Sequence, residues 1–198
     1  MGSKVAFIGL GVMGYPMAGH LANNGLEVCV YNRTRAKMLQ WQAEYGGDWA
    51  DTPAAAVMAA EVVFCCVSND DALRSIALGS QGILASMESG SLLVDHTTAS
   101  AEVARELADV AAKTGVDFMD APVSGGQAGA ENGVLTVMCG ASDQVFQRAK
   151  TFMAAYARVS THMGSVGHGQ LTKMANQICI AGLLQALAEG IAFSVNAG

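Results

Sequence analysis

Lys173 is the only Lys, Arg, Asp or Glu between Arg158 and Glu189, and the residues after it are mainly apolar. Two interpretations fit such an isolated ammonium. A surface lysine can lay its aliphatic stem along apolar surface while its charged head stays in water. Alternatively, a lysine at the mouth of a poorly solvated pocket can serve as the acid or base of a reaction. The rest of the sequence has to separate these two possibilities.

The segment GLGVMG, at residues 9–14, predicts a dinucleotide-binding turn. The pattern G-x-G-x-x-G is weak by itself, but here a strand-like segment, Lys4–Ile8, precedes it and a helix-like segment follows. Gly9 permits the tight turn, Gly11 lets the backbone approach a pyrophosphate, and Gly14 allows close packing of helix on sheet. A merely tight strand-to-helix turn is the alternative. The expected cofactor contacts in this segment are Gly9, Leu10, Gly11, Val12, Met13 and Gly14.

The end of the second expected strand favours NADP(H) over NAD(H). Its sequence is VYNRTRAK, with Asn32 where an NAD-binding chain would carry an acidic residue. A carboxylate there would repel a 2′-phosphate, whereas the guanidinium of Arg33 can bind one through paired hydrogen bonds. We therefore expect Asn32, Arg33 and Thr34 on the phosphate. A solvated arginine at a strand end is the alternative.

Two further strand ends, CVSND and VDHTTAS, carry small polar residues toward the same edge of the expected sheet. Ligands of doubly wound sheets bind in the crevice outside the carboxyl ends of the strands. The expected contacts to the nicotinamide half of the cofactor are Val67, Ser68, Asn69 and Thr98. Helix capping is the alternative for Ser68 and for Ser100.

Composition narrows the class of protein. Hydrophobic residues form 52% of the 198 residues and charged residues 14%, which argues for a folded domain with a large core. The net charge of -6 comes without a basic run, so we expect no nucleic-acid partner. Five cysteines form no C-x-x-C pair, and reduced, buried thiols in a reducing compartment explain them better than disulfides. Four histidines without metal-ligand spacing are assigned surface or local structural roles, and no metal site is predicted.

The alternation of apolar runs and helical periods predicts an α/β fold, a Rossmann-type doubly wound and mostly parallel sheet followed by a long interdomain helix. The expected strands are Lys4–Ile8, Glu27–Tyr31, Val62–Val67, Leu92–Asp95, Val116–Met119, Thr136–Cys139 and Arg158–His162. The clearest helices are Gly14–Asn24, Arg35–Tyr45, Pro53–Ala60, Asp70–Leu78, Ala101–Thr114 and Asp143–Tyr156. Ser100 and Ser142 stand at N-cap positions, and Gly125–Gly133 is expected to be a long irregular loop.

From about Gly167 to the end we expect one helix of about 30 residues. We divide the chain into a nucleotide-binding domain at 1–164 and this helix, with the start of a helical domain, at 165–198. The apolar stretch Met174–Ala188 contains three amides and is expected to fall short of a membrane span. Its late part is apolar on more than one face, so another domain or chain should cover it. We therefore expect a soluble, cytoplasmic homo-oligomer.

The segment DAPVSGG places Ser124, Gly125 and Gly126 after an expected strand. Their backbone N–H groups and one hydroxyl could hold a carboxylate as an anion nest. Glycine-rich turns at strand ends are common, and such a turn is the alternative.

Four motifs in this order resemble the β-hydroxyacid dehydrogenase family. They are FIGLGVMGYPMAGHL, VDHTTAS, DAPVSGGQAGAENGVLTVMCG and GHGQLTKMANQ. The family includes 3-hydroxyisobutyrate dehydrogenase, tartronate semialdehyde reductase, glyoxylate/succinic semialdehyde reductase and, more distantly, 6-phosphogluconate dehydrogenase. YNRT is similar to the NADP-preferring reductases of the group.

The resemblance implies roles for the residues in these motifs. Thr98 would lie near the nicotinamide, Ser124, Gly125 and Gly126 would bind the substrate carboxylate, and Lys173 would be the acid/base residue. The family places an asparagine four residues after this lysine to bind the substrate oxygen. Here that position is Gln177, while Asn176 stands three residues after Lys173, and either amide can share its helix face. Members of the family also carry a further helical domain after the long helix.

The function so implied is an NADP(H)-dependent oxidoreductase, with NAD(H) possible, that interconverts a small β-hydroxy acid and its semialdehyde by hydride transfer. The expected partner is thus a small carboxylate-bearing aldehyde or hydroxy acid. Two alternatives stay open. One is an imine reductase-like enzyme on the same scaffold, and the other is a nucleotide-binding fragment without turnover.

Overall fold

One mixed sheet forms the centre of the protein. The computed structural model describes residues 2–198, and in this range nine strands join the sheet. The strands are β1 (Lys4–Ile8), β2 (Glu27–Tyr31), β3 (Asp48–Trp49), β4 (Val62–Cys65), β5 (Leu92–Asp95), β6 (Asp117–Asp120), β7 (Val123–Ser124), β8 (Leu135–Gly140) and β9 (Ala157–Gly164). Their order is β3-β2-β1-β4-β5-β6-β8-β7, with β9 paired to β8. Strands β1 to β6 run parallel, while β8 is antiparallel to β6 and β7. The predicted doubly wound, mostly parallel sheet is confirmed.

Most strand ends agree with the sequence prediction. β1, β2 and β5 begin and end at the expected residues, and β6, β8 and β9 differ by one or two residues at each end. β4 ends at Cys65 rather than Val67, because the N–H of Val67 donates to the hydroxyl of Thr97 instead of continuing the ladder. β3 and β7 are two residues long, too short to leave a periodic pattern, and the sequence does not predict them.

The helices connect and cover these strands. They are α1 (Gly14–Asn23), α2 (Arg35–Tyr45), α3 (Pro53–Val57), α4 (Asp70–Ala77), α5 (Ile83–Ser86), α6 (Ala101–Thr114), α7 (Gly126–Glu131), α8 (Asp143–Met153) and α9 (His168–Ala197). α2 and α6 match their expected bounds, whereas α3 and α8 end three residues early. The chain leaves α3 before Ala59, whose φ of 60° is left-handed. α7 occupies the segment predicted as an irregular loop, because a six-residue, glycine-rich helix gives no clear period.

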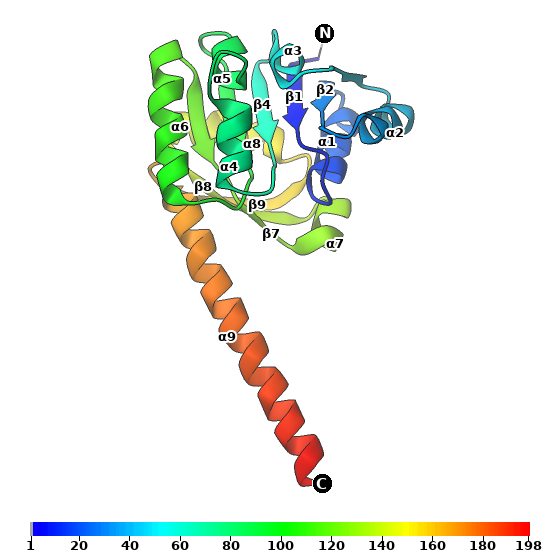
Figure 1. Cartoon of the computed structure of the whole chain (residues 1–198), viewed down its shortest axis with the longest axis vertical. Coiled ribbons are helices and arrows are strands. Elements are labelled where there is room, and N and C mark those ends of the chain that lie inside the picture. Colours follow the sequence, from blue (N-terminus) through cyan, green and yellow to red (C-terminus); the bar gives the residue numbers. More distant parts are fainter. Residues whose placement is uncertain (1) are drawn as a thin grey trace.

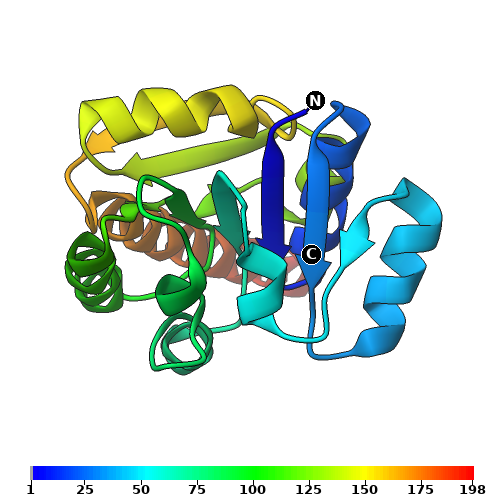
Figure 2. The same ribbon diagram turned by 90° about the horizontal axis from the view of Figure 1, so that it is seen from above.

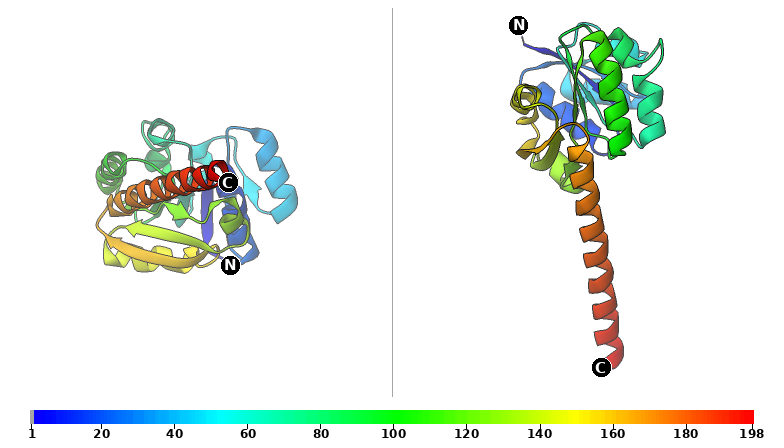
Figure 3. Two further views of the ribbon diagram at one scale, coloured as in Figure 1. Left: turned by 90° about the horizontal axis from the view of Figure 1, so that it is seen from below. Right: turned by 90° about the vertical axis from the view of Figure 1, so that its left-hand side faces the viewer.

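Two apolar layers lie on opposite faces of the sheet. Phe64 and Val94 face the layer formed with α1, α2 and α8, while Val63 and Leu93 face the layer formed with α3 to α6. Figures 2 and 3 show α6 and α8 on opposite sides of the sheet. The central strands are therefore buried on both faces, which explains their nearly continuous apolar runs.

Caps at the helix ends follow the sequence closely. The hydroxyl of Ser100 accepts a hydrogen bond from the N–H of Val103 (3.1 Å), and that of Ser142 accepts one from Val145 (3.4 Å). Gly115 ends α6 in the left-handed conformation, with φ of 73°. Both predicted N-caps are confirmed.

α9 extends away from the rest of the protein (Figure 1) and is exposed along most of its length. Ile178 and Phe193 are 74% and 75% exposed. Cys179 is also exposed, contrary to the expectation of buried thiols, because it lies on this uncovered part of the helix.

By length and composition, α9 could cross a membrane. Its most apolar 18-residue window has a mean hydropathy of 1.8, and no residue of that window is buried. The expectation that the apolar stretch falls short of a span concerned Met174–Ala188, whereas the helix that contains it runs over His168–Ala197. Length and composition alone do not distinguish a membrane helix from one that another protein surface covers.

Two ionisable side chains are buried at the carboxyl end of β5. Oδ1 of Asp95 accepts a hydrogen bond from the N–H of Thr97 (3.0 Å), and within residues 2–198 its Oδ2 has no partner. Burial raises the pKa of Asp95 to about 7. Next to it, the ring of His96 contacts Ala121 O (2.6 Å) and the hydroxyl of Tyr156 (2.8 Å), and burial lowers the pKa of His96 to about 4. This histidine has the local structural role that the sequence predicts.

Replacing Asp95 with Asn should stabilise the protein increasingly as pH rises. The folded state of the natural chain binds the Asp95 proton more tightly than the unfolded state, so its stability falls as pH rises from about 4 to about 7. Asn does not titrate, so between about pH 4.5 and about pH 8 the free energy of unfolding of Asp95→Asn should rise relative to that of the natural chain by the order of 4 kcal/mol. Urea unfolding at about pH 4.5 and about pH 8 measures this difference.

Asp109→Asn, at an exposed carboxylate, is the matched control and should show no such trend. A constant difference between Asp95→Asn and the natural chain across this range would contradict the assignment.

Candidate active site

A cavity of about 410 Å³ lies at the carboxyl ends of β1, β2 and β4, where the strand order reverses. This is where open α/β sheets bind their ligands. Nine of the expected cofactor residues line it, namely Gly9, Gly11, Val12, Met13, Asn32, Arg33, Thr34, Val67 and Ser68. The sequence did not single out the other lining residues, which are Tyr31, Lys37, Cys66, Ala72, Ser75 and Ile76. Burial raises the pKa of the Cys66 thiol to about 12, so this residue brings no thiolate charge to the cavity.

The glycines between β1 and α1 fit a closely approaching ligand. A side chain at Gly9 would clash with the carbonyl oxygen of Cys66, and one at Gly14 would clash with that of Gly9. A Cβ at Gly11, in contrast, would meet no protein atom within 4 Å, and Gly11 lines the cavity. The turn thus leaves open, beside Gly11, the space that a bound pyrophosphate needs.

Asn32 braces this glycine turn from the end of β2. Its Oδ1 accepts a hydrogen bond from the N–H of Leu10 (3.0 Å), and its Nδ2 donates to the carbonyl of Thr34 (3.3 Å). Each polar atom of its side chain therefore has one backbone partner. Leu10 is itself buried, and Gly14 packs beneath the turn, so neither lines the cavity.

Three basic side chains follow Asn32 in the sequence. Arg33 and Lys37 both line the cavity and are both exposed. The Nζ of Lys37 donates a hydrogen bond to the carbonyl of Leu10 (3.4 Å). Arg35 lies over the ring of Trp49 and does not line the cavity. The clustering of basic residues in RTRAK is the sequence signal that could have identified Lys37.

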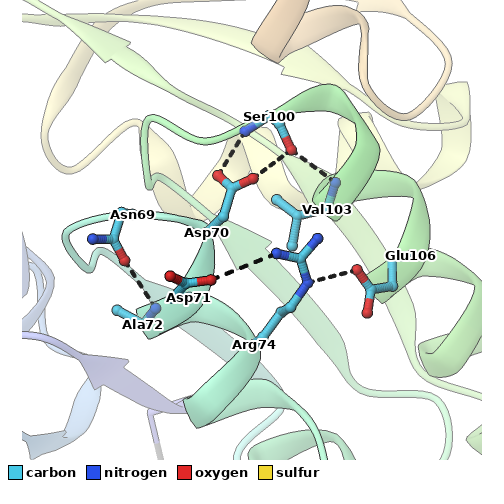
Figure 4. Close-up of polar contacts among 8 residues, drawn as sticks. All are labelled: Asn69, Asp70, Asp71, Ala72, Arg74, Ser100, Val103 and Glu106. Carbon is cyan, nitrogen blue, oxygen red and sulfur yellow. Dashed lines mark hydrogen bonds and ion pairs between the residues drawn. The ribbon is translucent and has the colours of Figure 1, made fainter.

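The loops after β4 and β5 are joined by polar contacts (Figure 4). The carboxylate of Asp70 accepts hydrogen bonds from the N–H (2.9 Å) and the hydroxyl (2.6 Å) of Ser100. Arg74 pairs with Glu106 at 2.8 Å, which ties α4 to α6 one turn further along. These contacts join the two loops, although they are 30 residues apart in sequence.

Within these loops the expected nicotinamide contacts take different places. Ser68 lines the cavity, but the side chain of Asn69 caps α4 by accepting the N–H of Ala72 (2.9 Å). Capping was the alternative for Ser68, and the structure gives that role to Asn69 instead. Thr98 is exposed and lies outside the lining of the cavity.

The start of α9 is fixed by the buried carboxylate of Asp120, the last residue of β6. Asp120 accepts hydrogen bonds from the N–H groups of Gly167 (2.7 Å) and Gln170 (2.9 Å). Burial raises the pKa of this carboxyl, while the backbone hydrogen bonds oppose that shift. A Cβ at Gly169 would lie 2.8 Å from Asp120 Oδ2, so the glycine allows the close contact. The carboxylate also compensates the positive end of the helix.

Lys173 is one turn beyond this anchor and is only 8% exposed. Burial lowers its pKa, and within residues 2–198 it forms no ion pair. Most of the side chain is therefore buried, while its Nζ has no hydrogen-bond partner in the described residues and is not among the fully buried unpartnered atoms. Asn176 is half-buried and Gln177 is exposed, and the two side chains bond to one another at 3.3 Å.

The expected carboxylate-binding residues lie between β7 and α7. Ser124 is half-buried at the end of β7, and Gly125 and Gly126 are exposed with φ of 133° and 62°. Neither these residues nor Lys173 line the cavity at the glycine turn. The sequence missed Asp120 and Gln170, although Gln170 is a polar residue three positions before Lys173 and therefore on the same helix face.

Comparisons with known proteins agree with this geometry. The family model described as the NAD binding domain of 6-phosphogluconate dehydrogenase matches residues 4–164. An uncharacterized oxidoreductase of Shewanella frigidimarina is 58% identical over 99% of this chain and 67% of its own length. The 3-hydroxyisobutyrate dehydrogenase of Pseudomonas aeruginosa is 36% identical over 99% of this chain and 65% of its own.

A solved structure gives the same result for the fold. The 3-hydroxyisobutyrate dehydrogenase of Mycobacterium tuberculosis, determined with L-serine, has a TM-score of 0.93 and 30% identity, covering 100% of this chain and 67% of that one. This chain thus spans about two thirds of the length of these relatives.

Substitution of two glycines in the same turn distinguishes an effect on ligand binding from an effect on stability. Gly11→Ala should keep the thermal stability of the protein but weaken dinucleotide binding at least about tenfold, because its methyl group enters only the cavity. Gly14→Ala should instead lower the free energy of unfolding by about 1–3 kcal/mol, because it overpacks the turn.

Thermal unfolding without ligand and fluorescence titration with NADPH measure the two effects. Unchanged affinity in Gly11→Ala would mean that the dinucleotide does not approach this turn.

Proposed function

The chain belongs to the family of 6-phosphogluconate dehydrogenase-like NAD-binding domains, together with 3-hydroxyisobutyrate dehydrogenase-like oxidoreductases. From this premise we propose that it is an NADP(H)-dependent oxidoreductase that interconverts a small β-hydroxy acid and its semialdehyde, with Lys173 as the acid/base. The observation that carries the proposal is a buried lysine without an ion-pair partner, one turn beyond the anchored start of α9.

The glycine turn and the strand ends around it would hold the cofactor. Its pyrophosphate would lie against the backbone at Gly9 and Gly11, and its nicotinamide half would extend past Val67 and Ser68. When bound, the nicotinamide supplies or accepts the hydride of the reaction. Thr98 would lie near that ring. Asn69 would lie on the nicotinamide side of the site, where its cap on α4 holds its side chain.

The 2′-phosphate of NADP(H) would be recognised by Arg33, Thr34 and Lys37. Two cations and a hydroxyl lie on the rim of the cavity, and no carboxylate is among its lining residues. The contribution of Asn32 is then indirect, since its amide already binds the backbone of Leu10 and Thr34. Positive charge at this end of the cavity favours the phosphorylated dinucleotide.

Lys173 would act on the substrate oxygen. In the reducing direction its protonated Nζ donates a hydrogen bond to the carbonyl oxygen and then transfers its proton as negative charge develops there. A lysine with a lowered pKa gives up that proton more readily, and in the reverse direction the neutral amine takes the hydroxyl proton. Ser124 and the backbone of Gly125 and Gly126 would orient the substrate carboxylate. Of the two amides that follow Lys173 within one turn, the half-buried Asn176 has less access to solvent than Gln177.

Three further parts of the proposal concern the whole protein. We assign residues 1–164 to nucleotide binding and residues 165–198 to an interdomain helix. The uncovered apolar surface of α9 supports a homo-oligomer, in which other protein surface covers this helix. The absence of disulfides among the five cysteines fits a cytoplasmic location.

Arg33→Ala tests the cofactor preference. Loss of the guanidinium should raise the dissociation constant for NADPH by about 10- to 100-fold, the range expected for a hydrogen bond to a charged group. The constant for NADH should change by less than about threefold. Arg35→Ala is the matched control, because Arg35 is near in sequence but lies over Trp49 rather than in the cavity. Equal weakening of both cofactors would contradict NADP(H) specificity.

Lys173→Met tests the chemistry. Turnover of a semialdehyde acid with NADPH should fall at least about 100-fold, because general acid catalysis is lost, while NADPH still binds. Lys150→Met, at an exposed lysine on α8, is the control and should keep normal turnover. Steady-state assays with semialdehyde acids and with cyclic imines identify the substrate class. Reduction of imines alone would favour an imine reductase, and NADPH binding without any turnover would favour a binding module.

A further inference from the structure

We infer that Gln170 is a positioning residue that fixes the loop carrying Thr98 relative to Lys173. The inference rests on the proposed function, because it assigns Thr98 to the nicotinamide side of the site. It concerns a side chain that touches neither the cavity nor the lysine ammonium in any described contact, and that acts through the loop it binds.

Gln170 is fully buried and uses both ends of its amide. Its Oε1 accepts a hydrogen bond from the N–H of Ala99 (3.1 Å), and its Nε2 donates to the carbonyl of Thr97 (2.7 Å). These partners stand on either side of Thr98 and are more than 70 residues from Gln170 in sequence. The side chain therefore clamps the backbone around a single exposed residue.

The loop around Thr98 has further contacts on both sides of this residue. The Thr97 hydroxyl accepts the N–H of Val67, which lines the cofactor cavity, and Ser100 is held by Asp70. With Gln170 removed, the loop would stay attached to α4 and β4 but would lose its side-chain link to α9. That link joins the loop around Thr98 directly to the helix that carries the lysine, in addition to the anchor of α9 on Asp120.

Lys173 lies on the same helix face as Gln170, about 4.5 Å further along the axis. The backbone of Gln170 also donates to Asp120, so the same residue joins α9 to β6 and to the loop. A rigid helix turn therefore sets the separation between Thr98 and Lys173. Misplacement of reacting groups by about 1 Å can cost about 100-fold in rate.

A buried amide could also serve stability alone, and the test has to exclude this. Gln170→Leu keeps the volume of the side chain and removes both hydrogen bonds. Ser142→Ala is the control, because it removes the N-cap of α8. This helix covers the face of the sheet opposite to α4 and α6, so the substitution lowers stability away from the loop around Thr98. Both variants are compared with the natural chain in hydrogen exchange, NADPH binding and turnover.

In Gln170→Leu, exchange of the Ala99 amide should accelerate at least about tenfold without ligand, because its acceptor is gone. The dissociation constant for NADPH should stay within about threefold, the fluorescence of the bound nicotinamide should change, and kcat should fall about 100-fold. Ser142→Ala should lower thermal stability and leave these readouts unchanged.

Faster Ala99 exchange with natural fluorescence and natural kcat would overturn the inference and leave Gln170 a structural role. If the natural chain binds NADPH but reduces no carbonyl acid, the proposed function fails, and the nicotinamide fluorescence of Gln170→Leu alone decides the inference. If it binds no NADPH, both proposals are overturned.

Discussion

The contact between the carboxylate of Asp120 and the first turn of α9 holds the site together. A buried carboxylate is costly, but here it satisfies N–H groups of Gly167 and Gln170 that the helix cannot satisfy itself. The closeness of this contact explains Gly140 and Gly169, since a Cβ on either would meet the Asp120 carboxylate. Most of α9 beyond this region is exposed, so its direction is set by the few residues at its base.

From this anchor, contacts lead to each other part of the candidate site. Asp120 is four residues before Ser124, Gln170 binds the loop around Thr98, and Lys173 follows one turn later. At the opposite end, Asn32 fastens the glycine turn to β2, and the Asp70–Ser100 contact joins the remaining two loops. Short polar side chains bound to backbone thus give irregular loops fixed positions around the cavity.

Charge is distributed unevenly across this arrangement. Arg33 and Lys37 lie on the exposed rim, where an anion can reach the guanidinium and the ammonium group. Lys173, Asp95 and Asp120 are buried. Burial lowers the pKa of the lysine and raises the pKa of the two carboxyl groups, which in each case favours the neutral form. The rim is therefore suited to binding a phosphate, whereas a buried lysine is suited to proton transfer.

The sequence by itself determined the sheet class, the glycine turn, the N-caps at Ser100 and Ser142 and the long final helix, because these depend on local periodicity and on side-chain bonds within three residues. It also identified most residues that line the cavity, since parallel strands bring their carboxyl ends to one edge. Only the tertiary structure decided that Asn32 and Asn69 bind backbone, that Lys37 joins the rim, and that Asp120 and Gln170 hold α9. The cap of Asn69 is local. The other outcomes depend on contacts between segments distant in the chain, and local patterns such as the basic run around Lys37 indicate a candidate residue but not its contacts.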